Sequence, residues 1–69
     1  MNHDQETELR TLLSGYCVHV PPKVANGSHN LAVEFKESVK TANKLLNRRA
    51  RANEQELRSM INKLHTYWT

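Results

Sequence analysis

Sixty-nine residues with 38% apolar content, one Trp and one Phe predict one small domain (residues 1–69) with a thin core, which self-association would enlarge. The single cysteine, Cys17, excludes an internal disulfide and is typical of a reducing, cytoplasmic setting. No apolar run reaches about 18 residues, so we expect no membrane span. These properties predict a cytoplasmic homodimer.

The net charge of +3 is unevenly distributed. Residues 1–35 hold two basic and four acidic residues and carry −2, whereas residues 36–69 hold eight basic and three acidic residues and carry +5. The basic half is therefore the expected contact surface.

The first expected element is a helix from Asp4 to Ser14. Carboxylates occupy its first turns, where they favour the positive end of the helix dipole. Its apolar side is formed by Leu9, Leu12, Leu13 and Tyr16. Gly15 is predicted to end it, as glycine commonly does just after a helix.

Residues 16–35 then follow a β-type pattern. Residues 16–20 alternate and are β-rich before Pro21-Pro22 interrupts them, and Asn26-Gly27 favours a turn. Residues 30–35 alternate strictly, with one face formed by Leu31, Val33 and Phe35. We expect a short strand here, which either pairs with the first run as a hairpin or follows loose chain.

The remainder of the chain, from Lys36 onward, has neither Gly nor Pro, so one long helix is conceivable. Asn53 followed by Glu56 nevertheless indicates a helix start, and arginines just before it suit the end of a preceding helix. We therefore predict two helices, at about 36–50 and 54–67. The expected fold class is mainly α with a short β-strand or hairpin.

The expected core combines the apolar positions of these elements. It consists of Leu31, Val33, Phe35, Val39, Leu46, Leu57, Ile61 and Leu64. Trp68 continues the apolar face of the last helix, so we expect it in the core; the alternative is an exposed contact, with Tyr67, for a protein partner.

Basic residues recur at near-helical spacing along the first C-terminal helix. They are Lys36, Lys40, Lys44, Arg48 and Arg51, with Arg49 beside them. Such a stripe favours contact with phosphates, and affinity should then fall with salt as counterions are released. The alternative is an ordinary solvated helix face.

A strand followed by two helices with a capped break resembles the ribbon-helix-helix family of small DNA-binding dimers. The resemblance rests on Leu31, Val33, Phe35, Val39, Ala42, Leu46, Asn53, Leu57, Ile61 and Leu64. It covers roughly residues 30–68 and leaves residues 1–29 as a partly flexible extension. It implies that paired strands enter the major groove, with Asn30, Ala32 and Glu34 facing the bases and Asn53 beside a phosphate.

No pattern in the sequence indicates catalysis or a metal site. Cys17, His19 and His29 lack the ligand spacing of zinc modules, and no motif places an orienting carboxylate or an oxyanion site beside them. We therefore expect a protein that is not an enzyme and that uses no metal and no cofactor.

The predicted function is a small non-enzymatic DNA-binding regulator, of transcription or of plasmid or phage control. The alternative is a small protein-interaction module of phage or plasmid type, which would meet an acidic protein surface and modulate a host protein or take part in assembly. Ala32 and Glu34 favour this alternative, because neither suits a surface that reads DNA.

Overall fold

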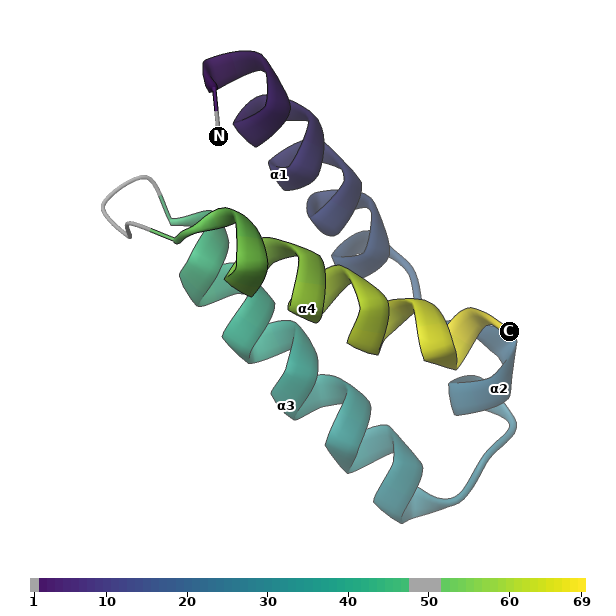
Figure 1. Cartoon of the computed structure of the whole chain (residues 1–69). Coiled ribbons are helices and arrows are strands. Elements are labelled where there is room, and N and C mark those ends of the chain that lie inside the picture. Colours follow the sequence, from purple (N-terminus) through teal and green to yellow (C-terminus); the bar gives the residue numbers. More distant parts are fainter. Residues whose placement is uncertain (1, 48–51) are drawn as a thin grey trace.

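The computed structural model describes residues 2–47 and 52–69, in which every regular element is a helix and no strand is present (Figure 1). The elements are α1 (His3–Val18), α2 (Pro22–Ala25), α3 (His29–Leu46), α4 (Glu54–His65) and the 3₁₀ turn η1 (Thr66–Trp68). The predicted strand or hairpin within residues 16–35 is therefore wrong, although the helical C-terminal half was expected.

Residues 30–35 lie in α3 because a helix cap and a row of buried residues outweigh their strand-like alternation of apolar and polar side chains. The Ser28 hydroxyl accepts a hydrogen bond from the Leu31 N–H at 3.2 Å and starts the helix. Phe35, Ser38 and Ala42 then recur at helical spacing and are buried. Val33 is 41% exposed, so the residue that completed the apparent strand face, and was expected in the core, points to solvent.

Residues 16–18 continue α1 instead of beginning a strand, so Gly15 does not end that helix. Tyr16 and Cys17 follow the fully buried Leu13 by three and four residues, and both are partly buried against the same core. The helix ends before Pro21, because the residue that precedes a proline is sterically biased towards extended backbone.

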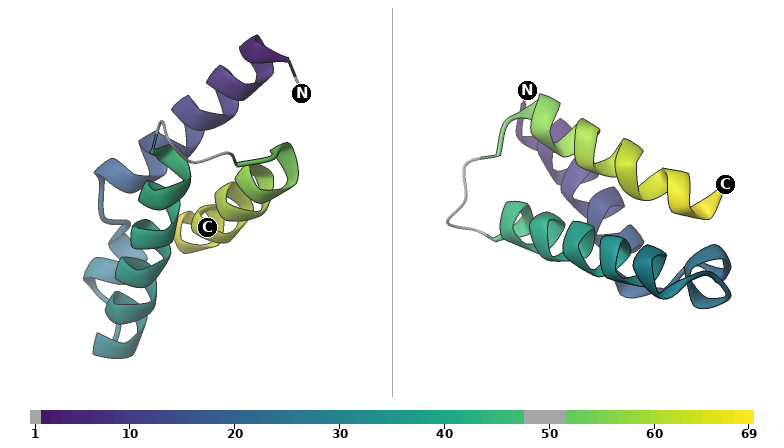
Figure 2. Two further views of the ribbon diagram at one scale, coloured as in Figure 1. Left: turned by 90° about the vertical axis from the view of Figure 1, so that its left-hand side faces the viewer. Right: turned by 90° about the horizontal axis from the view of Figure 1, so that it is seen from below.

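The core lies where the three long helices meet. α1 packs against both α3 and α4, and α3 runs in roughly the opposite direction to the other two (Figures 1 and 2). α2 lies beneath the C-terminal end, against η1 (Figure 1). Phe35 and Tyr67 join α3 to η1 through edge-to-face rings whose centroids are 5.4 Å apart.

Two polar contacts tie α1 to the ends of its neighbours. The Arg10 guanidinium donates to the carbonyl oxygen of Leu45 at 2.9 Å, in the last turn of α3, where a cation also suits the helix dipole. At the other end, the Tyr16 hydroxyl lies 3.0 Å from Nδ1 of His65, at the end of α4. Together they hold α1 across both helices.

The predicted helix start at Asn53 is confirmed. Its Oδ1 accepts a hydrogen bond from the Glu56 N–H at 2.8 Å, and its Nδ2 donates to the Glu56 carboxylate at 3.4 Å. α3 ends at Leu46, so a break separates the two helices; residues 48–50, expected within the first of them, lie outside the described residues.

The predicted core is partly confirmed. The predicted core residues that are buried are Phe35, Leu57, Ile61 and Leu64, and those that are partly buried against them are Leu31, Val39 and Leu46. The expectation for Trp68 is wrong, since it is 38% exposed while Tyr67 is buried. The 3₁₀ turn explains this, because about 120° per residue, in place of about 100°, rotates Tyr67 inward and Trp68 outward.

Replacement of each of the two glycines by alanine should change the stability of the fold in opposite directions. A Cβ at Gly15 meets nothing within 4 Å, so Gly15→Ala should raise the free energy of unfolding by about 0.5–1 kcal/mol. At Gly27 a Cβ would lie 2.6 Å from the Lys23 carbonyl oxygen, so Gly27→Ala should lower the free energy of unfolding by about 1–3 kcal/mol. Thermal melts followed by circular dichroism measure both, and equal effects would contradict the described positions of the two glycines.

Candidate functional site

Three lysines form an exposed row on α3, which we call the lysine face: Lys36, Lys40 and Lys44. Each follows the last by four residues, so the row turns only slightly along the helix and extends about 12 Å. Its side of α3 is opposite to that of the buried Phe35 and Ala42, which face α1 and α4. The row therefore projects away from the core.

The lysine face forms no ion pair within residues 2–47 and 52–69, since no carboxylate oxygen there lies within 4 Å of its ammonium groups. The two described arginines behave differently. Arg10 pairs with Glu6 and Arg58 pairs with Glu54, in both cases at 3.0 Å and one turn earlier in the helix. The positive charge of the row is thus presented to solvent.

The spacing of the row is unfavourable for the helix itself. Lys36, Lys40 and Lys44 make two like-charge pairs at four-residue spacing, and each such pair destabilises a helix by about 0.2–0.5 kcal/mol. The arrangement is therefore mildly destabilising without a counter-charge, and an anionic partner would relieve the repulsion.

A shallow hollow interrupts the lysine face near its N-terminal end. It has a volume of about 310 Å³ and is lined by Val33, Lys36, Glu37 and Lys40. The lining combines one apolar side chain, two cations and one carboxylate. The surface is therefore positive overall but includes an apolar and an acidic group.

The remaining predicted site residues do not join this row. Asn30 is exposed on the first turn of α3, Glu34 lines a cavity between α3 and α4, and Asn53 caps α4. Arg48, Arg49 and Arg51 lie outside the described residues. Because the described residues contain no strand, the ribbon that the ribbon-helix-helix resemblance requires is missing, and Asn30, Ala32 and Glu34 lie on a helix.

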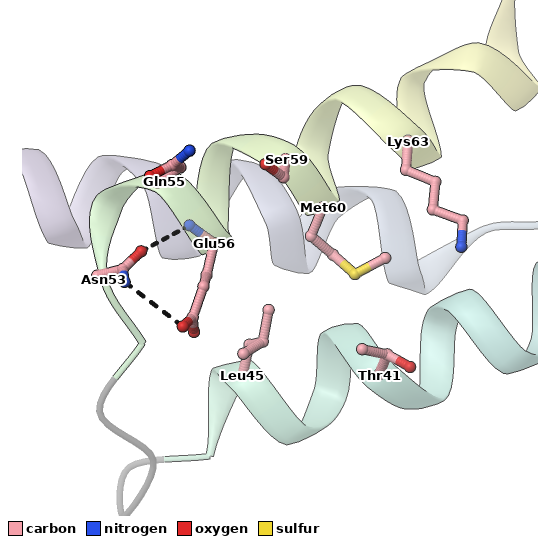
Figure 3. Close-up of a pocket in the computed structure, with 8 residues that line it drawn as sticks. All are labelled: Thr41, Leu45, Asn53, Gln55, Glu56, Ser59, Met60 and Lys63. Carbon is pink, nitrogen blue, oxygen red and sulfur yellow. Dashed lines mark hydrogen bonds between the residues drawn. The ribbon is translucent and has the colours of Figure 1, made fainter.

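A second surface feature, which the sequence reading did not identify, is a groove of about 610 Å³ between α3 and α4 (Figure 3). We call it the α3–α4 groove; it is lined by Thr41, Leu45, Asn53, Gln55, Glu56, Ser59, Met60 and Lys63. Glu56, Met60 and Lys63 point towards α3 in Figure 3, where α1 lies behind the two helices. Its lining residues flank the apolar stripes, and helical periodicity alone gives them no distinguishing signal.

The Cys17 thiol of α1 lies outside these two surfaces. Partial burial raises the pKa of the Cys17 thiol, because desolvation disfavours the thiolate. The thiol is therefore protonated at neutral pH and a poor nucleophile. In the described part of the chain, no three His, Cys, Asp or Glu side chains gather in a way that could hold a metal ion.

Comparisons with known proteins did not identify a relative of this chain. A scan of protein-family models, a search of curated proteins and a search of solved structures each found no match. Within residues 2–47 and 52–69, no helix has both the length and the apolar character needed to cross a bilayer.

Proposed function

We propose that this protein is a small non-enzymatic DNA-binding protein that contacts the phosphates of a duplex through the lysine face of α3. The observation that carries the proposal is the row itself: three exposed lysines on one side of a helix, with no described carboxylate within ion-pair distance. A net charge of +5 over residues 36–69 acts in the same direction.

The length of the row suits a polyanion with closely spaced charges. Each DNA strand carries one phosphate per about 3.4 Å of helix axis, so a row of about 12 Å spans about three phosphate intervals. Lysine serves as a point-charge phosphate contact and does not require the bidentate geometry of arginine. The three lysines can therefore bind one strand without a dedicated pocket.

The proposed binding is independent of DNA sequence. Phosphate contacts fix position, whereas base contacts specify sequence, and the described residues offer no ribbon for a groove. A regulatory role in transcription, or in plasmid or phage control, would then depend on where the protein is delivered or on a partner.

The alternative function is a protein-interaction module whose lysine face meets an acidic protein surface. Val33 favours it, because an exposed apolar side chain among cations suits a protein contact better than a phosphate backbone. Leu12 and Val18 of α1 are also exposed, at 50% and 68%. Binding to duplex DNA separates the two functions.

The test is binding of a fluorescent duplex of random sequence, followed by anisotropy at about 50 and 200 mM salt. Counterion release from three phosphate contacts predicts an affinity loss of about 40-fold between these conditions, and six contacts predict about a thousandfold. Absence of binding at the lower salt, or binding that salt does not weaken, would contradict the proposal and favour the acidic protein surface.

A further inference from the structure

We propose that the α3–α4 groove is the contact surface for a second copy of this chain, joined about a two-fold axis with the two α4 helices antiparallel. This inference is independent of DNA binding. It depends on which face of the α3–α4 pair is uncovered and on the order of charges along that face.

One face of the α3–α4 pair is covered and the other is open. α1 packs on both helices and buries Leu13 completely between them. None of the residues that line the α3–α4 groove comes from α1, which lies behind the pair in Figure 3. A second copy on the open side would sandwich the pair between two layers of helices.

The charges in the groove are self-complementary. Glu56 and Lys63 are seven residues apart, which is two helical turns or about 10.5 Å, and both side chains point into the groove (Figure 3). Their midpoint lies between Ser59 and Met60. An antiparallel α4 centred there places Glu56 beside the partner's Lys63 and Lys63 beside the partner's Glu56, as a two-fold contact requires.

The side chains at that midpoint permit a close approach. Ser59 is small and exposed, so a second helix can come near the α4 backbone. Met60 and Leu45 provide an apolar floor, and methionine adapts its shape to a partner surface. No described carboxylate lies within 4 Å of the Lys63 ammonium group, so this cation is available to the partner.

The flanking carboxylates limit the strength of this contact. Glu34 and Glu37 line the cavity that continues from the groove past Lys63. In the two-fold arrangement this end meets the first turn of the partner's α4, where the carboxylates of Glu54 and Glu56 oppose the positive helix dipole. The contact is small and partly polar, so we expect a dissociation constant of about micromolar magnitude.

The experiment uses the full chain without DNA, in sedimentation equilibrium from about 1 to 500 μM. The wild-type chain, 8.0 kDa as a monomer, should approach twice that mass as its concentration rises. Glu56→Lys and Lys63→Glu should each weaken dimerisation at least about tenfold, because each sets like charges against each other across the axis.

Mixing the two single variants provides the decisive result. The Glu56→Lys chain presents two cations in the groove, and the Lys63→Glu chain presents two carboxylates. An equimolar mixture should therefore recover the dimer that neither variant forms alone. Lys40→Glu is the matched control, because it makes the same charge change on the outer side of α3 and should dimerise like the wild type. Circular dichroism melts verify that each variant folds, and Glu56→Gln replaces Glu56→Lys in the single-variant comparison should the latter unfold.

Three outcomes would overturn the proposal: a wild-type chain that stays at 8.0 kDa over the whole range, folded single variants that dimerise as tightly as the wild type, or a mixture of folded single variants that remains monomeric. Each of these leaves the DNA proposal standing, because none of them measures the lysine face.

Discussion

Replacement of Leu57 by Asp is expected to unfold the protein. Leu57 is fully buried on α4, and removal of a buried leucine side chain alone lowers the free energy of unfolding by about 2–5 kcal/mol. A carboxylate in its place must either remain ionised without a counter-charge or bind a proton, and both add to the loss. The entire stability of a 69-residue domain is about 3–10 kcal/mol.

Far-ultraviolet circular dichroism and a urea titration measure this loss directly. The Leu57→Asp chain should show little helix and no cooperative transition. Asn62→Asp is the control, because it places the same side chain on an exposed position of the same helix and should stay within about 0.5 kcal/mol of the wild type. A folded Leu57→Asp chain would contradict the described core.

Replacement of all three lysines of the lysine face by glutamine should weaken DNA binding and make it less dependent on salt. Each phosphate contact contributes about 0.9 to the slope of log affinity against log salt, so the triple variant should lose about 2.7 of that slope. The fold should be retained or slightly stabilised, because the two like-charge pairs along α3 are removed.

Single variants provide the matched comparison. Lys40→Gln should reduce the slope by about 0.9, whereas Lys23→Gln, at an exposed position of α2, should leave the slope unchanged. A triple variant that keeps the wild-type slope would show that the phosphates are bound elsewhere, and equal effects of the two single variants would indicate general charge attraction instead of a defined face.

The sequence was sufficient to predict α4 because several signals coincide there. Asn53 and Glu56 supply the cap, and the apolar positions Leu57, Ile61 and Leu64 repeat at the helical period. Local preference, capping and burial all favour the same structure in this segment. Only the end differs, where the 3₁₀ turn exchanges Tyr67 and Trp68 between core and surface.

The segment 30–35 was misread because short apolar alternation does not distinguish a strand from a helix. Leu31 and Phe35 fit the two-residue period of a strand and also the spacing of a helix. Val33 fits only the strand pattern, and it is exposed in the folded chain. The buried side of α3 includes Ser38, a polar residue that an apolar pattern does not include. Its cap residue, Ser28, directly follows Asn26-Gly27, the pair that favours a turn, and the apolar pattern does not mark it as a helix start.

The lysine face could be predicted from spacing alone, since exposed residues of one type at four-residue intervals need only a helix to align them. The α3–α4 groove could not be predicted in this way. Its lining residues come from two consecutive helices, and how those helices face each other depends on how α1 holds α3 and α4 together. Only the packed structure brings Thr41 opposite Met60 and Lys63 (Figure 3).

The most direct test of the lysine face as the DNA-binding surface is a titration of the ¹⁵N-labelled chain with a random duplex at about 50 mM salt, followed by amide chemical shifts. We predict that, among residues 2–47 and 52–69, the largest shifts map to the outer side of α3 around Lys36, Lys40 and Lys44, and that they reverse as salt is added. The largest shifts on α1 or in the α3–α4 groove, or no shifts at all, would contradict the account.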